Sequence, residues 1–334
     1  MTSYRIAAPR LCGIVTALPE TVSENADLAG RFGEEVIRNI IKATGIERRP
    51  VSRQHTVSAL GAVAAEQLVG RLGWDKASIG LLIVVTQTPD YPLPSTACVL
   101  QRKLGLGDQL AAFDLALGCS GYVYGLSVAA SMMQAAGISR ALLVAGDMTS
   151  RMIGEADRAL APLFGDAVSV TALELGGEGE IGFDLGSDGS GAPYLISRTG
   201  GLAEPGPPEL FMDGTQVMAF SLKRVAPTIG RALDAAAMAI GAVTLIVLHQ
   251  ANAMMIRTLG QKIGARPDQL VYAVKDFGNT SSASIPLALC HRLSTAPSPP
   301  RLSLLLCGFG VGWSWATAAW PTAAPEVHDI IRVA

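Results

Sequence analysis

The feature that most constrains the fold of this 334-residue chain is an internal repeat. Segment 108–120 aligns, at an offset of 160 residues, with segment 268–280. Both begin with Asp-Gln-Leu, continue into an apolar run and end in a turn that contains glycine. Two flanking apolar runs repeat at offsets of 163 and 162 residues: 82–87 with 245–250, and 142–146 with 304–308. Because these elements recur in the same order, we predict a duplicated architecture.

Each copy alternates short runs rich in Val, Ile and Leu with helical segments, a pattern typical of parallel strands in a layered α/β sheet. Apolar residues make up 49% and charged residues 16% of the chain, which indicates an extensive interior. We predict two halves, residues 1–175 and 176–334. The segment 176–222 is rich in Gly and Pro and is interpreted as loops that connect the two halves. Segment 295–300 is interpreted as a loop, and the tail from residue 327 is left unassigned.

Charge and cysteine content exclude several classes of protein. The net charge of -2 gives no overall electrostatic reason for binding nucleic acid or an anionic membrane. Every apolar run is far shorter than the roughly 20 residues of a membrane helix, and residues 1–10 do not resemble a secretory signal. We therefore expect a cytoplasmic protein. The five cysteines include no Cys-x-x-Cys pair, which argues against a disulfide framework and a metal site.

Cys119 is the candidate nucleophile. Ligands of α/β sheets gather beyond the carboxyl ends of strands, and Cys119 lies there, at a strand-to-helix turn before a helix expected at about 120–134. The N-terminus of that helix favours a thiolate. The other four cysteines are interpreted as structural.

His249 and Asn279 are the candidate partners of Cys119. His249 closes an expected strand, 244–248, and a cysteine with a histidine elsewhere in the chain is typical of covalent catalysis. Asn279 is the repeat counterpart of Cys119, although an asparagine in a Gly-Asn-Thr turn is by itself typical of a turn or cap. The glycine-rich run 308–312 lacks the ending of a phosphate loop. A strand is expected at 313–320, so a hairpin whose N–H groups hold an oxyanion fits better.

Four segments together resemble the β-ketoacyl-acyl-carrier-protein synthase III family of the thiolase superfamily: 116–121, 248–252, 277–286 and 308–312. Shorter matches lie at 44–49, 94–98, 157–158 and 164–166. The resemblance implies a thiolase-like five-layer αβαβα fold and a homodimer. It also implies an acyltransferase that needs no cofactor. The reaction would be a decarboxylative Claisen condensation of an acyl thioester, expected to be acyl-CoA, with malonyl-ACP to give 3-oxoacyl-ACP through an acyl-cysteine.

The same resemblance implies a role for each matched residue. Cys119 would carry the acyl group, and His249 and Asn279 would donate hydrogen bonds to the malonyl thioester oxygen. The backbone N–H groups of Cys119 and Val311 would form the oxyanion hole, with Phe309 and Gly310 beside the substrate. A catalytically inactive scaffold would be expected to have lost at least one of the three catalytic side chains, and none is lost.

Departures from the family concern the donor. The Trp and Arg that commonly hold the CoA adenine correspond here to Asn39 and Ala43, whereas Arg151 matches another arginine that contacts CoA. Acyl-CoA is therefore favoured, and an acyl-ACP donor stays open. Leu93 stands where a Phe frequently reaches into the partner's acyl pocket. These changes indicate a specialised member of the family.

Further departures concern the carrier protein and competing activities. Two positions that carry basic residues for carrier-protein docking in the family are Ala219 and Met254 in this chain. Arg257 and Lys262 would compensate for the two lost charges. A degradative thiolase would need a second cysteine where Phe309 stands. A relative that acylates an alcohol or amine without decarboxylation would not need Asn279, and that reading is kept as the alternative.

Overall fold

The computed structural model describes residues 2–334, which form two mixed β-sheets. The strands of the first sheet lie in the order β15 (Val327–Val333), β2 (Arg10–Pro19), β8 (Ala167–Glu174), β7 (Arg140–Asp147), β5 (Ile79–Val85) and β6 (Ala111–Leu115). Those of the second lie in the order β1 (Thr2–Ala7), β9 (Glu180–Ser187), β14 (Ser314–Ala323), β13 (Arg301–Gly310) and β12 (Leu245–Leu248). The series β2-β8-β7-β5 and β9-β14-β13-β12 have matching order and strand directions, which confirms the duplicated fold.

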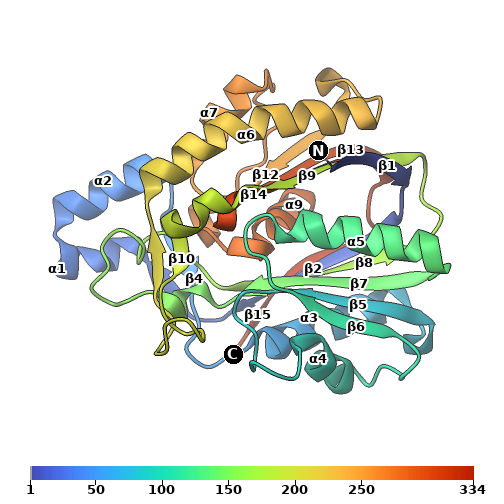
Figure 1. Ribbon diagram of the computed structural model, residues 1–334, viewed down its shortest axis with the longest axis horizontal. Coiled ribbons are helices and arrows are strands. Elements are labelled where there is room, and N and C mark those ends of the chain that lie inside the picture. The colour runs from blue at the N-terminus through green and yellow to red at the C-terminus, as the bar shows by residue number, and fades with distance from the viewer. Residues whose placement is uncertain (1) are drawn as a thin grey trace.

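Helices fill the three layers around these sheets (Figure 1). On the outer face of the first sheet lie α3 (Val57–Leu72) and α4 (Thr96–Leu104). Between the sheets lie α5 (Gly121–Ala136) and α9 (Ser284–Thr295), and over the second sheet lie α6 (Gly214–Ala235) and α7 (Ala253–Lys262). The predicted five-layer αβαβα arrangement is therefore confirmed.

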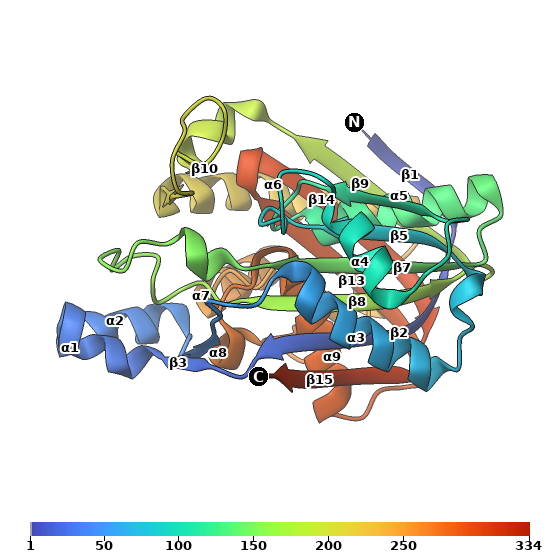
Figure 2. The same cartoon turned by 90° about the horizontal axis from the view of Figure 1, so that it is seen from below.

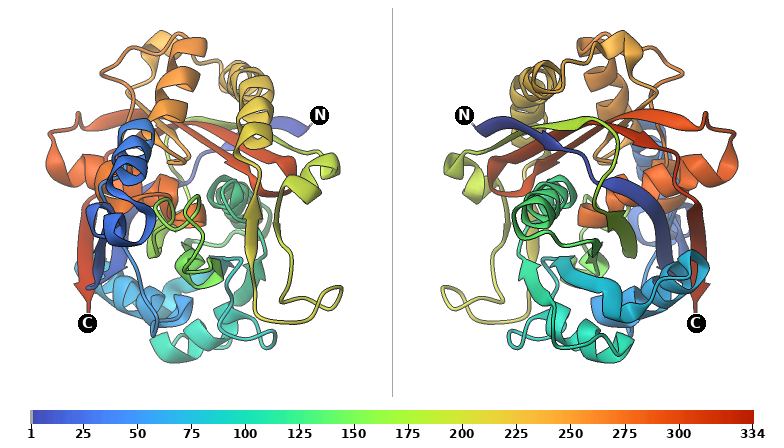
Figure 3. Two further views of the ribbon diagram at one scale, coloured as in Figure 1. Left: turned by 90° about the vertical axis from the view of Figure 1, so that its left-hand side faces the viewer. Right: turned by 90° about the vertical axis from the view of Figure 1, so that its right-hand side faces the viewer.

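Smaller elements project beside this core. Figure 2 shows α1 (Ala29–Phe32) and α2 (Glu34–Thr44) at one end, next to the short pair β3 (Val22–Glu24) and β4 (Arg48–Pro50). The hairpin of β10 (Leu195–Ser197) and β11 (Leu210–Met212) ends in a protruding loop, yellow in Figure 3. The short helix α8 (Val274–Phe277) precedes the turn that holds Asn279.

The central helix α5 packs against β5 and β7, and Gly125 faces these strands. A Cβ added to Gly125 would come within 2.8 Å of the Val85 side chain and 2.7 Å of that of Leu143. Strand β5 is apolar on both faces, as a strand buried between two helical layers must be. This close packing fixes the turn before α5, which carries Cys119.

The structure corrects two expectations about elements, assigns one segment that the sequence left open and shifts one boundary. Segment 176–222 is more than a connector, since β9 within it pairs with β1 and β14 and its end begins α6. The tail from residue 327 forms β15, paired with β2. The expected strand after Asp268 is reduced to one bridge, between Ile246 and Leu270. The run expected to be a strand from residue 313 begins one residue later, because a 3-10 turn covers Val311–Trp313.

Each half contributes one terminal strand to the sheet of the other half. Strand β1, at the N-terminus, pairs antiparallel with β9 in the second sheet, whereas β15, at the C-terminus, pairs parallel with β2 in the first. The division at residues 175 and 176 falls between β8 and β9 and stays a prediction. None of the helices in residues 2–334 combines the length and the hydropathy that a membrane span requires.

Candidate active site

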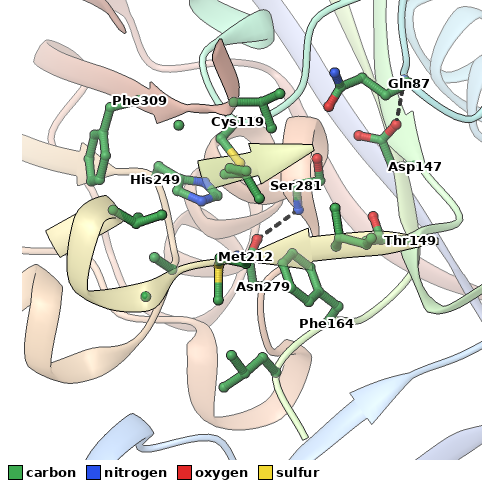
Figure 4. A pocket seen from close by; sticks show the side chains of 18 of the residues that line it. Gln87, Cys119, Asp147, Thr149, Phe164, Met212, His249, Asn279, Ser281 and Phe309 are labelled. Atoms are coloured by element: carbon green, nitrogen blue, oxygen red, sulfur yellow. Dashed lines mark hydrogen bonds between the residues drawn. The ribbon is translucent and has the colours of Figure 1, made fainter. Parts of the chain in front are cut away.

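Side chains from both halves converge on one cavity of about 270 Å³. Six of the residues singled out from the sequence line it: Cys119, His249, Asn279, Phe309, Gly310 and Val311. Figure 4 shows the sulfur of Cys119 facing the ring of His249, with Asn279 below them. The repeat thus places the functional positions of its two copies opposite each other.

The sulfur of Cys119 is enclosed by the glycine-rich end of β13. Cys119 is 6% exposed and follows β6 by a short turn that leads into α5. A Cβ added to Gly310 would lie 2.8 Å from the Cβ and 3.0 Å from the sulfur of Cys119. A Cβ on Gly308 would lie 2.6 Å from the Cys119 carbonyl oxygen. Only glycine at these positions lets the β13 backbone pass beside the nucleophile.

Burial decides the protonation of the thiol. Desolvation, and after it the nearby Asp147 side chain, raise the pKa of Cys119 to about 12. The Ser281 hydroxyl and the backbone N–H groups of Cys119 and Val311 act in the opposite direction, because they hydrogen-bond to the sulfur. The expected preference for a thiolate at the helix N-terminus is therefore outweighed in the resting cavity. The same two N–H groups are those predicted for the oxyanion hole.

Alkylation of Cys119 should follow this raised pKa. Because the reactive thiolate becomes populated only as the pH approaches about 12, its fraction, and with it the iodoacetamide rate, should rise about tenfold per pH unit from pH ~7 to ~10. Peptide mass spectrometry would follow the Cys119 adduct, with exposed Cys98 as an internal reference. A rate that levels off near neutral pH would contradict the buried-thiol assignment.

His249 follows β12 and is held by Ser284, a residue that the sequence analysis did not single out. The His249 Nδ1 and Ser284 Oγ lie 2.6 Å apart, both buried. In the described chain, Ser284 Oγ has no other acceptor within hydrogen-bond distance, so its hydroxyl donates to Nδ1 and the hydrogen of the ring lies on Nε2. Burial lowers the pKa of His249 to about 3, which keeps the ring neutral. The Phe309 ring stands edge-on to it, with centroids 5.6 Å apart.

Asn279 is held by its backbone and by its side-chain oxygen. Its N–H donates to the Leu163 carbonyl at 2.8 Å, and its carbonyl accepts the Gly165 N–H at 3.0 Å. Its Oδ1 accepts the Ser281 N–H at 2.9 Å. Across residues 2–334 the Nδ2 group has no protein partner, so it is left to donate into the cavity.

Asp147 lies near Cys119, bonds to segments of both halves and was also not predicted. It ends β7, is buried, and accepts the Gln87 N–H at 2.7 Å. From the second half it accepts the N–H of Ser282 at 3.1 Å and its hydroxyl at 2.7 Å. The sequence signal was an acidic residue at the end of a buried strand. These bonds place the turn that carries Asn279.

The remaining predicted residues lie outside this cavity. Leu93 is 82% exposed, on the loop between β5 and α4. Arg151 lines a second cavity of about 390 Å³, which shares Phe164 with the first. Arg257 and Lys262 lie on the outer helix α7, where Lys262 donates to the Leu222 carbonyl at 2.5 Å.

Two family models and a curated relative match this chain. A family model described as 3-oxoacyl-[acyl-carrier-protein (ACP)] synthase III matches residues 113–189, and the model of its C-terminal part matches residues 233–321. Beta-ketoacyl-[acyl-carrier-protein] synthase III of Roseiflexus castenholzii is 35% identical, over 90% of this chain and 94% of that protein.

Solved structures are similar over nearly the whole chain. The 3-oxoacyl-(acyl-carrier protein) synthase of Burkholderia xenovorans LB400 has 36% identity and a TM-score of 0.95, with 99% of each chain covered. The priming beta-ketosynthase of the R1128 polyketide biosynthetic pathway has 29% identity and a TM-score of 0.88, with 98% of this chain and 99% of that chain covered.

Proposed function

This chain belongs to the 3-oxoacyl-[acyl-carrier-protein] synthase III family, and on that premise we propose that it condenses an acyl thioester with malonyl-ACP, releasing carbon dioxide and 3-oxoacyl-ACP. The observation that carries the proposal is the convergence of Cys119, His249 and Asn279 on one cavity. Acyl transfer to an alcohol or amine remains the alternative, but it leaves the unpaired Nδ2 of Asn279 without a role.

The first half-reaction is acyl transfer to Cys119. The sulfur attacks the acyl carbonyl, its proton passes to the departing donor thiol, and the bond between the carbonyl carbon and the donor sulfur breaks. The N–H groups of Cys119 and Val311 hold the oxyanion of the tetrahedral intermediate. One such donor typically lowers the barrier by about 3 kcal/mol.

The second half-reaction forms the new carbon–carbon bond. The malonyl carboxylate leaves as carbon dioxide, and its bonding electron pair becomes the enolate of the thioester. Neutral His249, through Nε2–H, and Asn279, through Nδ2–H, donate to the enolate oxygen. The enolate carbon attacks the acyl carbonyl, and Cys119 departs as a thiolate that takes a proton from solvent.

Product analysis tests the proposal. Incubation with an acyl-CoA and malonyl-ACP should yield 3-oxoacyl-ACP, which intact-protein mass spectrometry of the carrier detects, together with free CoA. Acyl-Cys119 without 3-oxoacyl-ACP, but with turnover when an alcohol or amine is supplied, would support the alternative. Absence of both products with every donor would refute both readings.

Acyl-CoA is the donor favoured by the second cavity. Arg31, Arg53 and Arg151 line it, and Arg31 and Arg53 are engaged with Glu155. Arg151 donates only through Nε, to the Ser52 carbonyl, so its two Nη groups have no partner among residues 2–334. Those groups suit a phosphate of CoA.

Arg151→Ala should therefore raise the KM for acyl-CoA roughly tenfold, the effect of one lost ionic contact. The native KM should rise with salt more steeply than that of the variant, because screening weakens the same attraction. Steady-state kinetics with one acyl group on CoA and on ACP would measure this. Arg301→Ala, in an exposed ion pair, is the matched control. A native preference for acyl-ACP of tenfold or more would overturn the choice of CoA.

We also propose a homodimer, in which Leu93 reaches the partner's acyl cavity. Strand β6 leaves one edge of the first sheet unpaired, and the exposed side chains of Tyr91 and Leu93 lie on the loop after the neighbouring β5. An unpaired strand edge is a ready surface for a second copy.

Leu93→Phe should lower kcat/KM for long acyl donors, since overpacking a filled pocket costs about 1–3 kcal/mol, and should spare acetyl-CoA. The kcat/KM values for a series of acyl-CoA donors would be compared between the native enzyme and Leu93→Phe. Light scattering would give the oligomeric state of both proteins. A native preference for acetyl-CoA that the substitution leaves unchanged would contradict this role of Leu93.

Carrier docking by Arg257 and Lys262, and a cytoplasmic location, remain proposals. Both side chains lie on α7, the helix that also carries the half-exposed Met254 at the rim of the cavity. Since Lys262 is bound to α6 through the Leu222 carbonyl, Arg257 is the freer cation for an acidic carrier protein.

A further inference from the structure

The two ends of the active-site cavity have opposite chemistry. Apolar side chains line the part of the cavity that opens to the surface, among them Ile196 and Met254. Ile196 is 38% and Met254 47% exposed, which marks this end as the mouth. Beyond Cys119 the lining is polar and comes from the ends of β5 and β7: Gln87, Thr88, Asp147 and Thr149. Figure 4 shows Gln87, Asp147 and Thr149 on the opposite side of Cys119 from Phe309.

Because Cys119 lies between the two ends of the cavity, each end contacts a different part of the bound acyl donor. A thioester that enters through the mouth keeps its carrier arm among the apolar side chains when its carbonyl reaches the sulfur. The acyl chain then continues past Cys119. Its first carbons therefore meet Gln87 and Thr149.

Two polar groups at this inner end lack protein partners. Both oxygens of Asp147 are occupied by donors, and Thr88 Oγ1 accepts the Met148 N–H at 2.9 Å. By contrast, no residue from 2 to 334 hydrogen-bonds to the side-chain amide of Gln87 or the hydroxyl of Thr149, although Thr149 is only 6% exposed. Both side chains line the cavity, and Gln87 is partly exposed, so a ligand in the cavity can supply the missing bonds.

Gln87 is held close to the reacting atoms. A Cβ added to Gly118, next to Cys119, would lie 2.2 Å from the Gln87 amide oxygen. The absence of a side chain at Gly118 therefore makes room for this amide on the turn that carries the nucleophile.

We propose that the preferred acyl donor carries a neutral hydroxyl group close to its thioester, which bonds to the Gln87 amide and the Thr149 hydroxyl. This inference rests on the proposed function. A hydroxyl matches the site because an amide and a hydroxyl each offer a donor and an acceptor. The adjacent carboxylate of Asp147 disfavours an acyl group that ends in a carboxylate.

Two donors of equal shape test the proposal. 3-Hydroxybutyryl-CoA and isovaleryl-CoA differ by a hydroxyl in place of a methyl group. The native enzyme should acylate Cys119 from one enantiomer of the hydroxy donor at least about tenfold faster, in kcat/KM, than from isovaleryl-CoA. Gln87→Met and Thr149→Val keep the side-chain size, and each should bring that ratio close to one. Arg301→Ala, in an exposed ion pair outside the cavity, should leave the ratio as it is in the native enzyme.

The outcomes separate this inference from the proposed function. Equal rates, or a preference for isovaleryl-CoA, would overturn the inference, whereas acylation of Cys119 by either donor keeps the proposed function. If neither donor nor acetyl-CoA acylates Cys119, both fail. The inference would also be overturned if Thr149→Val and Gln87→Met keep the native ratio of kcat/KM for the two donors. If one variant does not fold, the other variant decides.

Discussion

Replacing Cys119 by Ala should abolish acyl-enzyme formation and lower condensation by on the order of 10⁶-fold, as loss of a covalent nucleophile does elsewhere. The reason is positional. Cys119 is the cysteine that lines the active-site cavity, where Gly310 leaves space at its sulfur and His249 faces it. Intact-protein mass spectrometry after incubation with an acyl-CoA should show one acyl group on the native enzyme and none on Cys119→Ala.

The other cysteines supply the controls. Cys98 is exposed on α4, and Cys307 is buried in β13 beside the hydroxyl of Thr317. Cys98→Ala should therefore acylate as the native enzyme does. Peptide mapping that finds the acyl group on Cys98 or Cys307, with Cys119 free, would refute the assignment of the nucleophile.

Replacing Asn279 by Ala should leave acylation of Cys119 intact and slow malonyl-ACP decarboxylation by roughly 10²-fold or more. The substitution removes the Nδ2 donor, whereas Cys119 and the N–H groups near its sulfur stay in place. The two half-reactions are measured separately, acylation by mass spectrometry and decarboxylation by release of labelled carbon dioxide.

Asn279→Asp is the sharper variant. Its carboxylate still accepts the Ser281 N–H that Oδ1 accepts in the native chain, but it offers no donor to the enolate. We expect it to fold normally and to decarboxylate as poorly as Asn279→Ala. Undiminished 3-oxoacyl-ACP formation by either variant would move the preference to acyl transfer without decarboxylation.

Much of the architecture could be predicted from the sequence because it depends on local and periodic properties. The apolar runs 82–87 and 245–250 reveal matched strands, and their repetition in order reveals the duplication. The Gly-Cys-Ser turn before α5 and the histidine after β12 could be recognised for the same reason. The tertiary structure places both in one cavity, as the ends of repeated strands must be.

Other features could not be predicted, because they depend on which distant segments meet. Strand β9 lies in a segment whose Gly and Pro content reads as a loop, and only pairing with β1 and β14 makes it a strand. The same holds for β15, whose partner β2 lies at the other end of the chain.

The chemistry of the site divides in the same way. The residue types and spacing of Cys119, His249 and Asn279 were enough to single them out. The sequence could not show that Ser284 sets the hydrogen on His249, or that Gln87 and Thr149 face the cavity without partners. Nor could it show that burial raises the pKa of the Cys119 thiol to about 12, against the helix N-terminus. Hydrogen-bond partners and desolvation exist only once residues far apart in the chain enclose a common interior.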